Sequence, residues 1–281
     1  MTGRLHGESP YEGLRRELAA DCGRCRGLCC GALCFSKGAG FPDEKPAGVP
    51  CRHLLPDFRC ALHESPAYRA LRGCMAYDCL GAGPRTTALF GGRERALSPK
   101  ETGRMYAVYL TVRRLCQMEW YLVEAASLLP ARELLPEAGA LIEGLERPVA
   151  GPPEALDRLD PEGLYPRVDG VLRRAWALCR AAVGAPPEER GGGDLCGRRF
   201  RGEALCGRDL SGALLLAAKL RGCRLWGTNF LGADLRDADL SGADLRESVF
   251  LTQGQLAAAK GDRSTLLPAW ARYPMTWTDA S

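Results

Sequence analysis

The C-terminal third of the chain places a large apolar residue at every fifth position. These residues are Leu195, Phe200, Leu205, Leu210, Leu215, Leu220, Leu225, Phe230, Leu235, Leu240, Leu245 and Phe250. Small residues lie two positions before most of the later ones, at Ala213, Ala218, Cys223, Thr228, Ala233, Ala238, Ala243 and Ser248. A period of five fits neither an α-helix nor an ordinary strand. It predicts a solenoid in which each pentapeptide forms one side of a square coil, with both residues pointing toward its axis.

The middle of the chain has a helical period instead. Residues 98–101, Ser-Pro-Lys-Glu, form a helix start with a capping box. Apolar residues then follow at helical spacing, at Met105, Val108, Val112, Leu115, Met118 and Leu122. We expect this helix to end before Pro130, a second to span about 131–146 and a third about 161–183. The stripe predicts a packed core. The aromatic residues beside it that could instead line a pocket are Tyr106, Tyr109, Trp120 and Tyr121.

The stretch GADLRDADLSGADLR at residues 232–246 closely resembles the repeats of the pentapeptide-repeat family. The resemblance implies a right-handed quadrilateral β-helix over residues 193–254. At strand spacing, such a rod would be only about 15 Å long, or about three coils. Some members of the family imitate DNA, which requires a long acidic rod, whereas basic and acidic residues are nearly balanced here. We therefore expect a docking surface for a protein partner and no nucleic-acid mimicry.

Nine of the fourteen cysteines are concentrated in the N-terminal third. Residues 21–34 read DCGRCRGLCCGALC, in which Cys22 and Cys25 form a CxxC pair that can turn both sulfurs toward one ion. Cys29 and Cys30 are adjacent and point to opposite sides of an extended chain, so they suit two neighbouring sites or two irons of one cluster. Dense cysteine in a reducing compartment indicates metal more often than disulfides. The segment therefore predicts a metal site.

This segment resembles the CxxCxxxCC family of zinc- or iron-chelating domains, in the form found in bacterial proteins with C-terminal pentapeptide repeats. The likeness extends over CRHLLPDFRCALHESPAYRALRGCMAYDCLGAG at residues 51–83. It implies eight metal ligands, which are Cys22, Cys25, Cys29, Cys30, Cys51, Cys60, Cys74 and Cys79. Cys34 is an additional thiol, and His53 or His63 could replace a thiol as a ligand. Thiolate ligation suits an iron–sulfur cluster or iron, which we favour, with zinc as the alternative.

The length of the chain indicates the number of domains, and its charge indicates the class of partner. The 281 residues suffice for about two domains, and the formal net charge of +4 is mixed along the chain. Neither a nucleic-acid nor a membrane partner is indicated, and the absence of a long apolar stretch or a signal-like start predicts a cytoplasmic protein. We expect a multidomain chain composed of an N-terminal helix or tail (1–18), a Cys-rich α/irregular metal-binding domain (19–97), a helical module (98–184), a linker (185–192), the repeats (193–254) and a capping helix with a tail (255–281).

Two functions are compatible with these residues. We favour a non-enzymatic metal-binding protein, a sensor or an accessory protein, whose repeats form a docking scaffold. The alternative is an iron-dependent enzyme that modifies a small molecule or a protein side chain, because some relatives of the CxxCxxxCC class are linked to protein methylases. The sequence shows no open coordination position, nucleophile elbow, phosphate-binding loop or dinucleotide fingerprint, so we assign no catalytic residue. A third alternative, a secreted module stabilised by disulfides, is disfavoured because the sequence shows no export signal.

Overall fold

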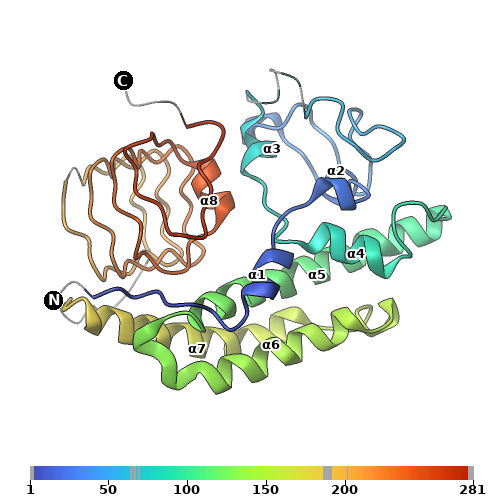
Figure 1. Cartoon of the computed structure of the whole chain (residues 1–281). Coiled ribbons are helices and arrows are strands. Elements are labelled where there is room, and N and C mark those ends of the chain that lie inside the picture. Colours follow the sequence, from blue (N-terminus) through green and yellow to red (C-terminus); the bar gives the residue numbers. More distant parts are fainter. Residues whose placement is uncertain are drawn as a thin grey trace. The chain divides into compact units, whose positions relative to one another are not determined.

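The computed structural model describes residues 3–63, 65, 68, 70–185, 192–200 and 202–277 (Figure 1). The chain divides into two compact units. Unit 1 consists of Met1–Ser9, Glu124–Leu135 and Leu172–Ser281, and unit 2 consists of Pro10–Val123 and Pro136–Val171. The linker predicted at 185–192 falls almost entirely outside the described residues, as do the last four residues of the predicted tail.

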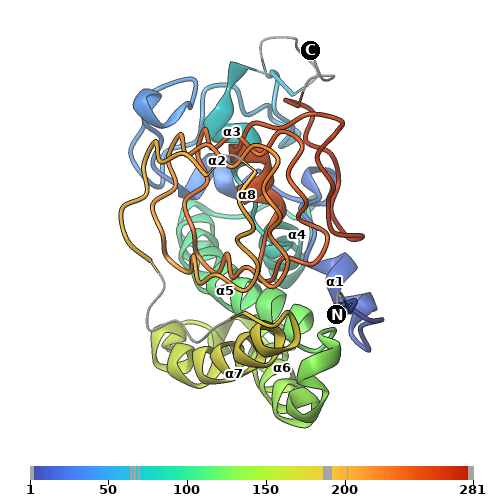
Figure 2. The ribbon, with the colours of Figure 1, turned by 90° about the vertical axis from the view of Figure 1, so that its left-hand side faces the viewer.

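The repeats in unit 1 wind into a coil whose successive turns are twenty residues apart. One residue of each pentapeptide forms an isolated parallel bridge with the next turn, as Asp194 does with Leu214 and Lys219 with Asp239. Between these bridges the backbone also pairs, and Leu215 N donates to Asp234 O at 2.9 Å. The turns lie one beside the next in both views (Figures 1 and 2, orange to red). The large and small residues of the period fill the interior and are almost all fully buried, which confirms their predicted inward direction.

The predicted right-handed quadrilateral β-helix is wrong. Within the described ranges of the chain there is no β-strand and no sheet, and neighbouring turns of the coil are joined by single bridges. The reason is the short length of each side. A turn occupies part of every pentapeptide, and glycines such as Gly212 (φ 63°) and Gly232 (φ 65°) adopt the left-handed conformation there. No side is left with the run of consecutive bridged residues that defines a strand.

A short helix caps the C-terminal end of the coil. Helix α8 (Gln253–Ala258) begins with a capping box, in which Thr252 N donates to the Gln255 side chain at 2.8 Å and Gln255 N donates to the Thr252 hydroxyl at 3.2 Å. The Gln255 side-chain amide also donates to Phe230 O at 2.8 Å, a carbonyl of the coil. The capping helix predicted at the start of residues 255–281 is thus confirmed, although it begins at Gln253 and ends at Ala258.

The N-terminal segment belongs to the same unit as the coil. The Glu247 carboxylate accepts hydrogen bonds from Leu5 N at 2.7 Å and His6 N at 3.1 Å. The His6 ring lies 3.0 Å from Ser248 O. Near the end of helix α5, the Glu124 carboxylate accepts from Phe250 N at 2.8 Å. Two distant parts of the sequence are therefore tied to the last repeats.

Unit 2 is built from helices and irregular loops. Its helices, which include three that continue into or begin in unit 1, are α1 (Glu12–Glu17), α2 (Leu28–Ala32), α3 (Arg72–Ala76), α4 (Ala82–Leu89), α5 (Pro99–Ala125), α6 (Leu135–Ala150) and α7 (Pro161–Ala182). The short 3-10 helices are η1 (Cys22–Arg24), η2 (Lys37–Ala39), η4 (Leu129–Leu134) and η5 (Pro153–Ala155), with η4 in unit 1. In both views α5, α6 and α7 lie side by side (Figures 1 and 2).

The helical module follows the sequence prediction closely. Helix α5 begins with the predicted capping box, in which Ser98 N donates to the Glu101 carboxylate at 2.9 Å. The apolar stripe of α5 is buried, which confirms it as core. Helix α7 matches the third predicted helix. The second predicted helix starts later than expected, at Leu135, because Leu129–Leu134 form the 3-10 helix η4, in which Ala131 departs from helical angles.

Candidate metal centre

One cavity in unit 2 gathers most of the predicted ligands. It has a volume of about 440 Å³. The thiols among its lining residues are Cys22, Cys25, Cys29, Cys30, Cys60, Cys74 and Cys79. The remaining predicted ligand, Cys51, is buried but does not line the cavity, and its backbone N–H donates to Cys30 O at 2.9 Å. The structure therefore brings seven of the eight predicted cysteines to one space.

Glycines let the backbone approach the sulfurs closely. Gly27 precedes helix α2 with a φ of 67°, and a Cβ added there would lie 2.4 Å from the Leu54 side chain. A Cβ at Gly83, in the first turn of α4, would lie 2.7 Å from Cys25 Sγ and 3.7 Å from Cys79 Sγ. Only a residue without a side chain fits between these two sulfurs, which come from opposite ends of the Cys-rich segment.

Backbone N–H groups point at two of the thiols. Leu28 N lies 3.5 Å from Cys25 Sγ, and the N–H groups of Gly81 and Gly83 hydrogen-bond to the thiol of Cys79. Burial raises the pKa of Cys79 to about 11, and these N–H groups offset part of that rise because they stabilise the thiolate. Such hydrogen bonds are the usual outer contacts of thiolates that bind metal.

The adjacent thiols of Cys29 and Cys30 interact directly, with their sulfurs 3.9 Å apart. Their S–H···S hydrogen bond raises the pKa of Cys29 and lowers that of Cys30, whose thiolate is also favoured by the Lys45 ammonium. Burial and the neighbouring thiols raise the pKa of Cys74 to about 12. Most of these thiols are therefore protonated at neutral pH until a cation compensates their charge.

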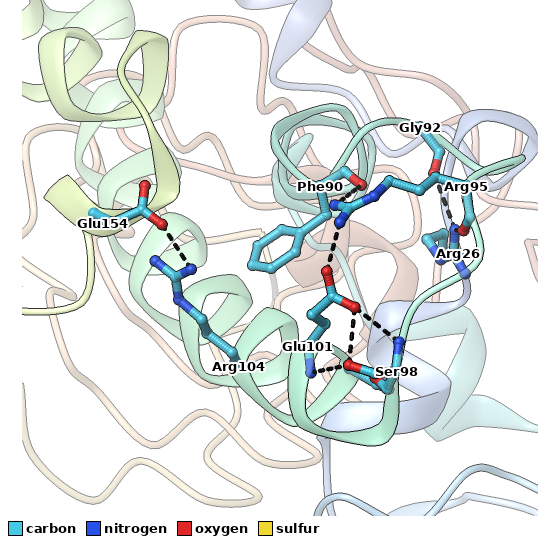
Figure 3. A network of polar contacts seen from close by, with 9 residues as sticks. Arg26, Phe90, Gly92, Arg95, Ser98, Glu101, Arg104 and Glu154 are labelled. Atoms are coloured by element: carbon cyan, nitrogen blue, oxygen red, sulfur yellow. Dashed lines mark hydrogen bonds and ion pairs between the residues drawn. The ribbon is translucent and has the colours of Figure 1, made fainter.

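A polar network anchors the CxxC segment to the start of α5 (Figure 3). The Arg26 guanidinium donates to the carbonyls of Gly92, Arg93 and Arg95 at 3.0, 2.9 and 2.7 Å. Arg95 in turn pairs with the Glu101 carboxylate at 2.5 Å, and Glu101 belongs to the capping box of α5. The guanidinium of Arg26, the residue after Cys25, is thus held by the loop at residues 92–95.

The side chains that were left open as ligands occupy different places. His63 lines the cavity, and its ring lies 4.9 Å from that of Tyr68. His53 lies outside the lining, 3.5 Å from the Asp43 carboxylate. Cys34 is exposed and also lies outside the lining. Cys116 and Cys179 are fully buried and also lie outside the lining.

The aromatic wall of the cavity differs from the one that the sequence suggested. None of the four aromatic residues considered on α5 is among the lining residues, whereas Phe35, Phe41, Phe58, Tyr68 and Tyr77 are. These five come from loops and short turns rather than from a periodic helix. The one signal that could have found Tyr77 is its position between Cys74 and Cys79.

The thiols are gathered but not yet in ligating positions. All fourteen cysteines lie within the described residues, and all are free thiols. Across the part of the chain that the structure describes, no three Cys, His, Asp or Glu side chains are grouped tightly enough to hold an ion. The eight predicted ligands therefore stay a prediction, and binding would require the thiols around the cavity to turn toward a common centre.

Comparison with known proteins gives a family match for the repeats and a relative that covers almost the whole chain. A family model described as pentapeptide repeats matches residues 213–250, in eight copies. The uncharacterized protein YybG of Bacillus subtilis (strain 168) is 44% identical over 271 residues, which cover 95% of this chain and 97% of YybG. This chain is a pentapeptide-repeat protein and belongs to one family with YybG. No solved structure matches it significantly.

The match to the family model confirms the pentapeptide repeats that the sequence predicted. The family match does not extend to the Cys-rich segment, so the resemblance of that segment to the CxxCxxxCC family stays a prediction. Among the helices of the described residues, none has the length and apolar character needed to cross a membrane.

Proposed function

We propose that this pentapeptide-repeat protein holds a thiolate-ligated metal centre, an iron–sulfur cluster or iron, in the cavity of unit 2. The observation that carries the proposal is the convergence of seven thiols, contributed by residues between 22 and 79, on one cavity. The donor set is dominated by sulfur, which suits soft metals and disfavours calcium or magnesium. An iron–sulfur cluster in this cavity would supply one-electron transfer.

The size of the cavity favours a cluster over a single zinc ion. A structural zinc needs four ligands, and seven thiols line this cavity. The volume of about 440 Å³ is also many times the roughly 30 Å³ that one water molecule occupies in the liquid. A polynuclear centre would use both the surplus of thiols and the space. Zinc is the alternative that metal analysis would reveal.

The electrostatics of the cavity also support a bound cation. Burial and mutual repulsion raise the pKa values of Cys74 and Cys79 to about 12 and about 11. Lys45 is a nearby cation, and its amino group already donates to the carbonyls of Gly31 and Leu33. A metal that binds these thiols would release their protons and stabilise the loops around them.

For the repeat coil we propose docking of a protein partner in the cytoplasm. The interior of the coil is filled by its own side chains, so a ligand has no space inside it. Its outer surface carries exposed leucines, and Leu214 and Leu216 are 48% and 39% exposed on either side of the buried Leu215. This arrangement supports a scaffold with an external contact surface.

An iron-dependent enzyme is the second candidate, and the cavity itself favours it. A volume of about 440 Å³ falls within the range of about 300–1,000 Å³ that is typical of small-molecule sites. Beside the thiols, its wall includes the stacked rings of Phe35 and Phe41, whose centroids are 4.4 Å apart. A small organic molecule that binds only the metal-loaded protein would favour this candidate over a sensor or accessory protein.

The test is the metal content of full-length protein purified without oxygen. We expect stoichiometric iron with sulfide and broad visible absorption, and we expect the double variant Cys25→Ser/Cys29→Ser to lose them. Cys34→Ser is the matched control, since Cys34 belongs to the same stretch but lies outside the cavity lining. Zinc in a colourless protein would overturn the iron assignment, and full retention of metal by the double variant would overturn the site.

A further inference from the structure

Two tyrosine hydroxyls form a pair beside the thiol cavity. The hydroxyl oxygens of Tyr77 and Tyr109 are 2.6 Å apart. Tyr109 lies on α5 and is fully buried, whereas Tyr77 lies between α3 and α4 and lines the cavity together with Cys29 and Cys79. The pair therefore links the helical core of unit 2 to the cavity wall.

The hydrogen bond between the two hydroxyls leaves one of their two O–H donors without an acceptor in the part of the chain that the structure describes. Each phenol carries one O–H proton, and a single hydrogen bond between them consumes one. Among the described residues, no hydrogen bond other than this one reaches either hydroxyl. One O–H donor is left over in a largely enclosed position, which is unfavourable unless an acceptor is supplied.

Burial decides which proton is left over. Tyr109 is fully buried and lies outside the cavity lining, whereas Tyr77 lines the cavity, so we take Tyr109 as the donor within the pair. Tyr77 then accepts from Tyr109 and keeps its own proton for the cavity. The Arg113 guanidinium lies 5.4 Å from the centroid of the Tyr77 ring, and a cation there strengthens this phenol as a donor.

The cavity offers sulfur as the acceptor. The thiols of Cys29 and Cys79 line the cavity together with Tyr77. An ordinary phenol carries its proton near neutral pH. A metal-bound thiolate or a bridging sulfide carries negative charge, so a hydrogen bond to it is charge-assisted.

We propose that Tyr77, oriented by Tyr109, is the hydrogen-bond donor of the cavity to its sulfur-ligated metal centre. The inference rests on the proposed function and adds a residue outside the eight cysteines. Tyr77 would act as a positioning residue, because it would donate to the sulfur ligands rather than bind the metal. Hydrogen bonds of this kind orient ligands and adjust the affinity and potential of the metal.

The test uses Co²⁺ as a spectroscopic probe of the full-length reduced protein. We expect Tyr77→Phe to bind Co²⁺ about tenfold more weakly and to shift the sulfur-to-cobalt charge-transfer band to lower energy. Tyr109→Phe should shift the band in the same direction by less. Tyr106→Phe is the matched control, since Tyr106 lies on the same helix and does not line the cavity. A Tyr77→Phe spectrum identical to that of the control would overturn the inference.

Two further results separate this inference from the proposed function. If Tyr77→Phe fails to fold, the shift in Tyr109→Phe decides, and no shift there counts against the inference. If the wild-type protein binds no Co²⁺ and no other metal, the proposed function fails. The donor is then tested in the metal-free protein, where Tyr77→Phe should lower the alkylation rate of Cys29 or Cys79 by iodoacetamide relative to Tyr106→Phe. Equal rates would overturn the inference.

Discussion

The repeat coil and the Cys-rich segment achieve order in opposite ways. In the coil, each turn repeats the same backbone contacts, and the interior is filled by apolar side chains from the chain itself. In the Cys-rich segment, the described residues between Leu33 and Leu71 contain no α-helix, and a cavity lined by thiols occupies the place of a core. We therefore expect the order of the coil to come from its own packing, and the order of the Cys-rich segment to come from the metal proposed above.

Removal of the metal should produce the largest difference between the two regions. Anaerobic chelation of the full-length protein should remove a calorimetric unfolding transition that belongs to the Cys-rich segment, because metal binding would supply the folding free energy of a segment with little core. The transition of the coil should persist at its original temperature. Superimposable calorimetric traces before and after chelation would show that the Cys-rich segment folds without metal.

Truncation of a side chain inside the coil should lower the stability of the coil and leave the Cys-rich segment unaffected. Leu220 is fully buried, so Leu220→Ala should lower the free energy of unfolding by about 2–5 kcal/mol. The metal content should not change. Leu216→Ala serves as the control, since Leu216 is 39% exposed and its truncation should cost less than about 0.5 kcal/mol. Denaturant unfolding measures both, and equal losses would argue against a stabilising coil interior.

A buried carboxylate in unit 2 should make stability depend on pH. Glu119 is fully buried, and burial raises its pKa from 4.5 to about 8, although Arg85 at 2.7 Å opposes the shift and Glu146 adds to it. The folded protein therefore binds this proton more tightly than the unfolded chain, so stability falls as the pH rises from about 4.5 to about 8. Each unit of pKa difference corresponds to about 1.4 kcal/mol.

Glu119→Gln should remove this part of the pH dependence. The measurement is the free energy of unfolding of both proteins at several pH values across that interval. Cys116 also contacts Arg85, with 3.4 Å between Nη1 and Sγ, but burial raises its pKa above the ordinary thiol value, so it stays protonated across this interval and adds little to either curve. Parallel curves for the two proteins would contradict the assignment.

The smallest effect is expected where the N-terminal segment meets the last repeats. Glu247→Gln keeps an acceptor for the N–H groups of Leu5 and His6 but removes its charge, so we expect a loss of about 1 kcal/mol from unit 1. The amide protons of both residues should also exchange faster. Unchanged exchange rates would show that the carboxylate does not hold this segment.

In the repeat coil, the sequence predicted which residues are buried but not the secondary structure. The inward direction of residues such as Leu215 and Ala218 followed from the five-residue period, because each repeat packs only on its neighbours. The strands of a β-helix were wrongly expected because the resemblance supplied them, while the short sides of the coil allow only single bridges. Local repetition therefore predicts burial better than it predicts secondary structure.

The cavity was only partly predictable. The resemblance to the CxxCxxxCC family implied which thiols would gather, and seven of the eight line one space. The aromatic wall could not be predicted, because Phe58 is positioned by a left-handed backbone angle (φ 64°) and by the Arg26 guanidinium 4.4 Å from its ring centroid. Such long-range contacts leave no periodic signal in a sequence.

X-ray absorption at the metal edge of full-length protein isolated without oxygen would identify the atoms that bind the metal. We predict a first coordination shell of sulfur alone at about 2.3 Å, whichever metal is bound. Metal–metal scattering would identify a cluster. A shell dominated by oxygen or nitrogen, or the absence of bound metal in stoichiometric amount, would contradict the account.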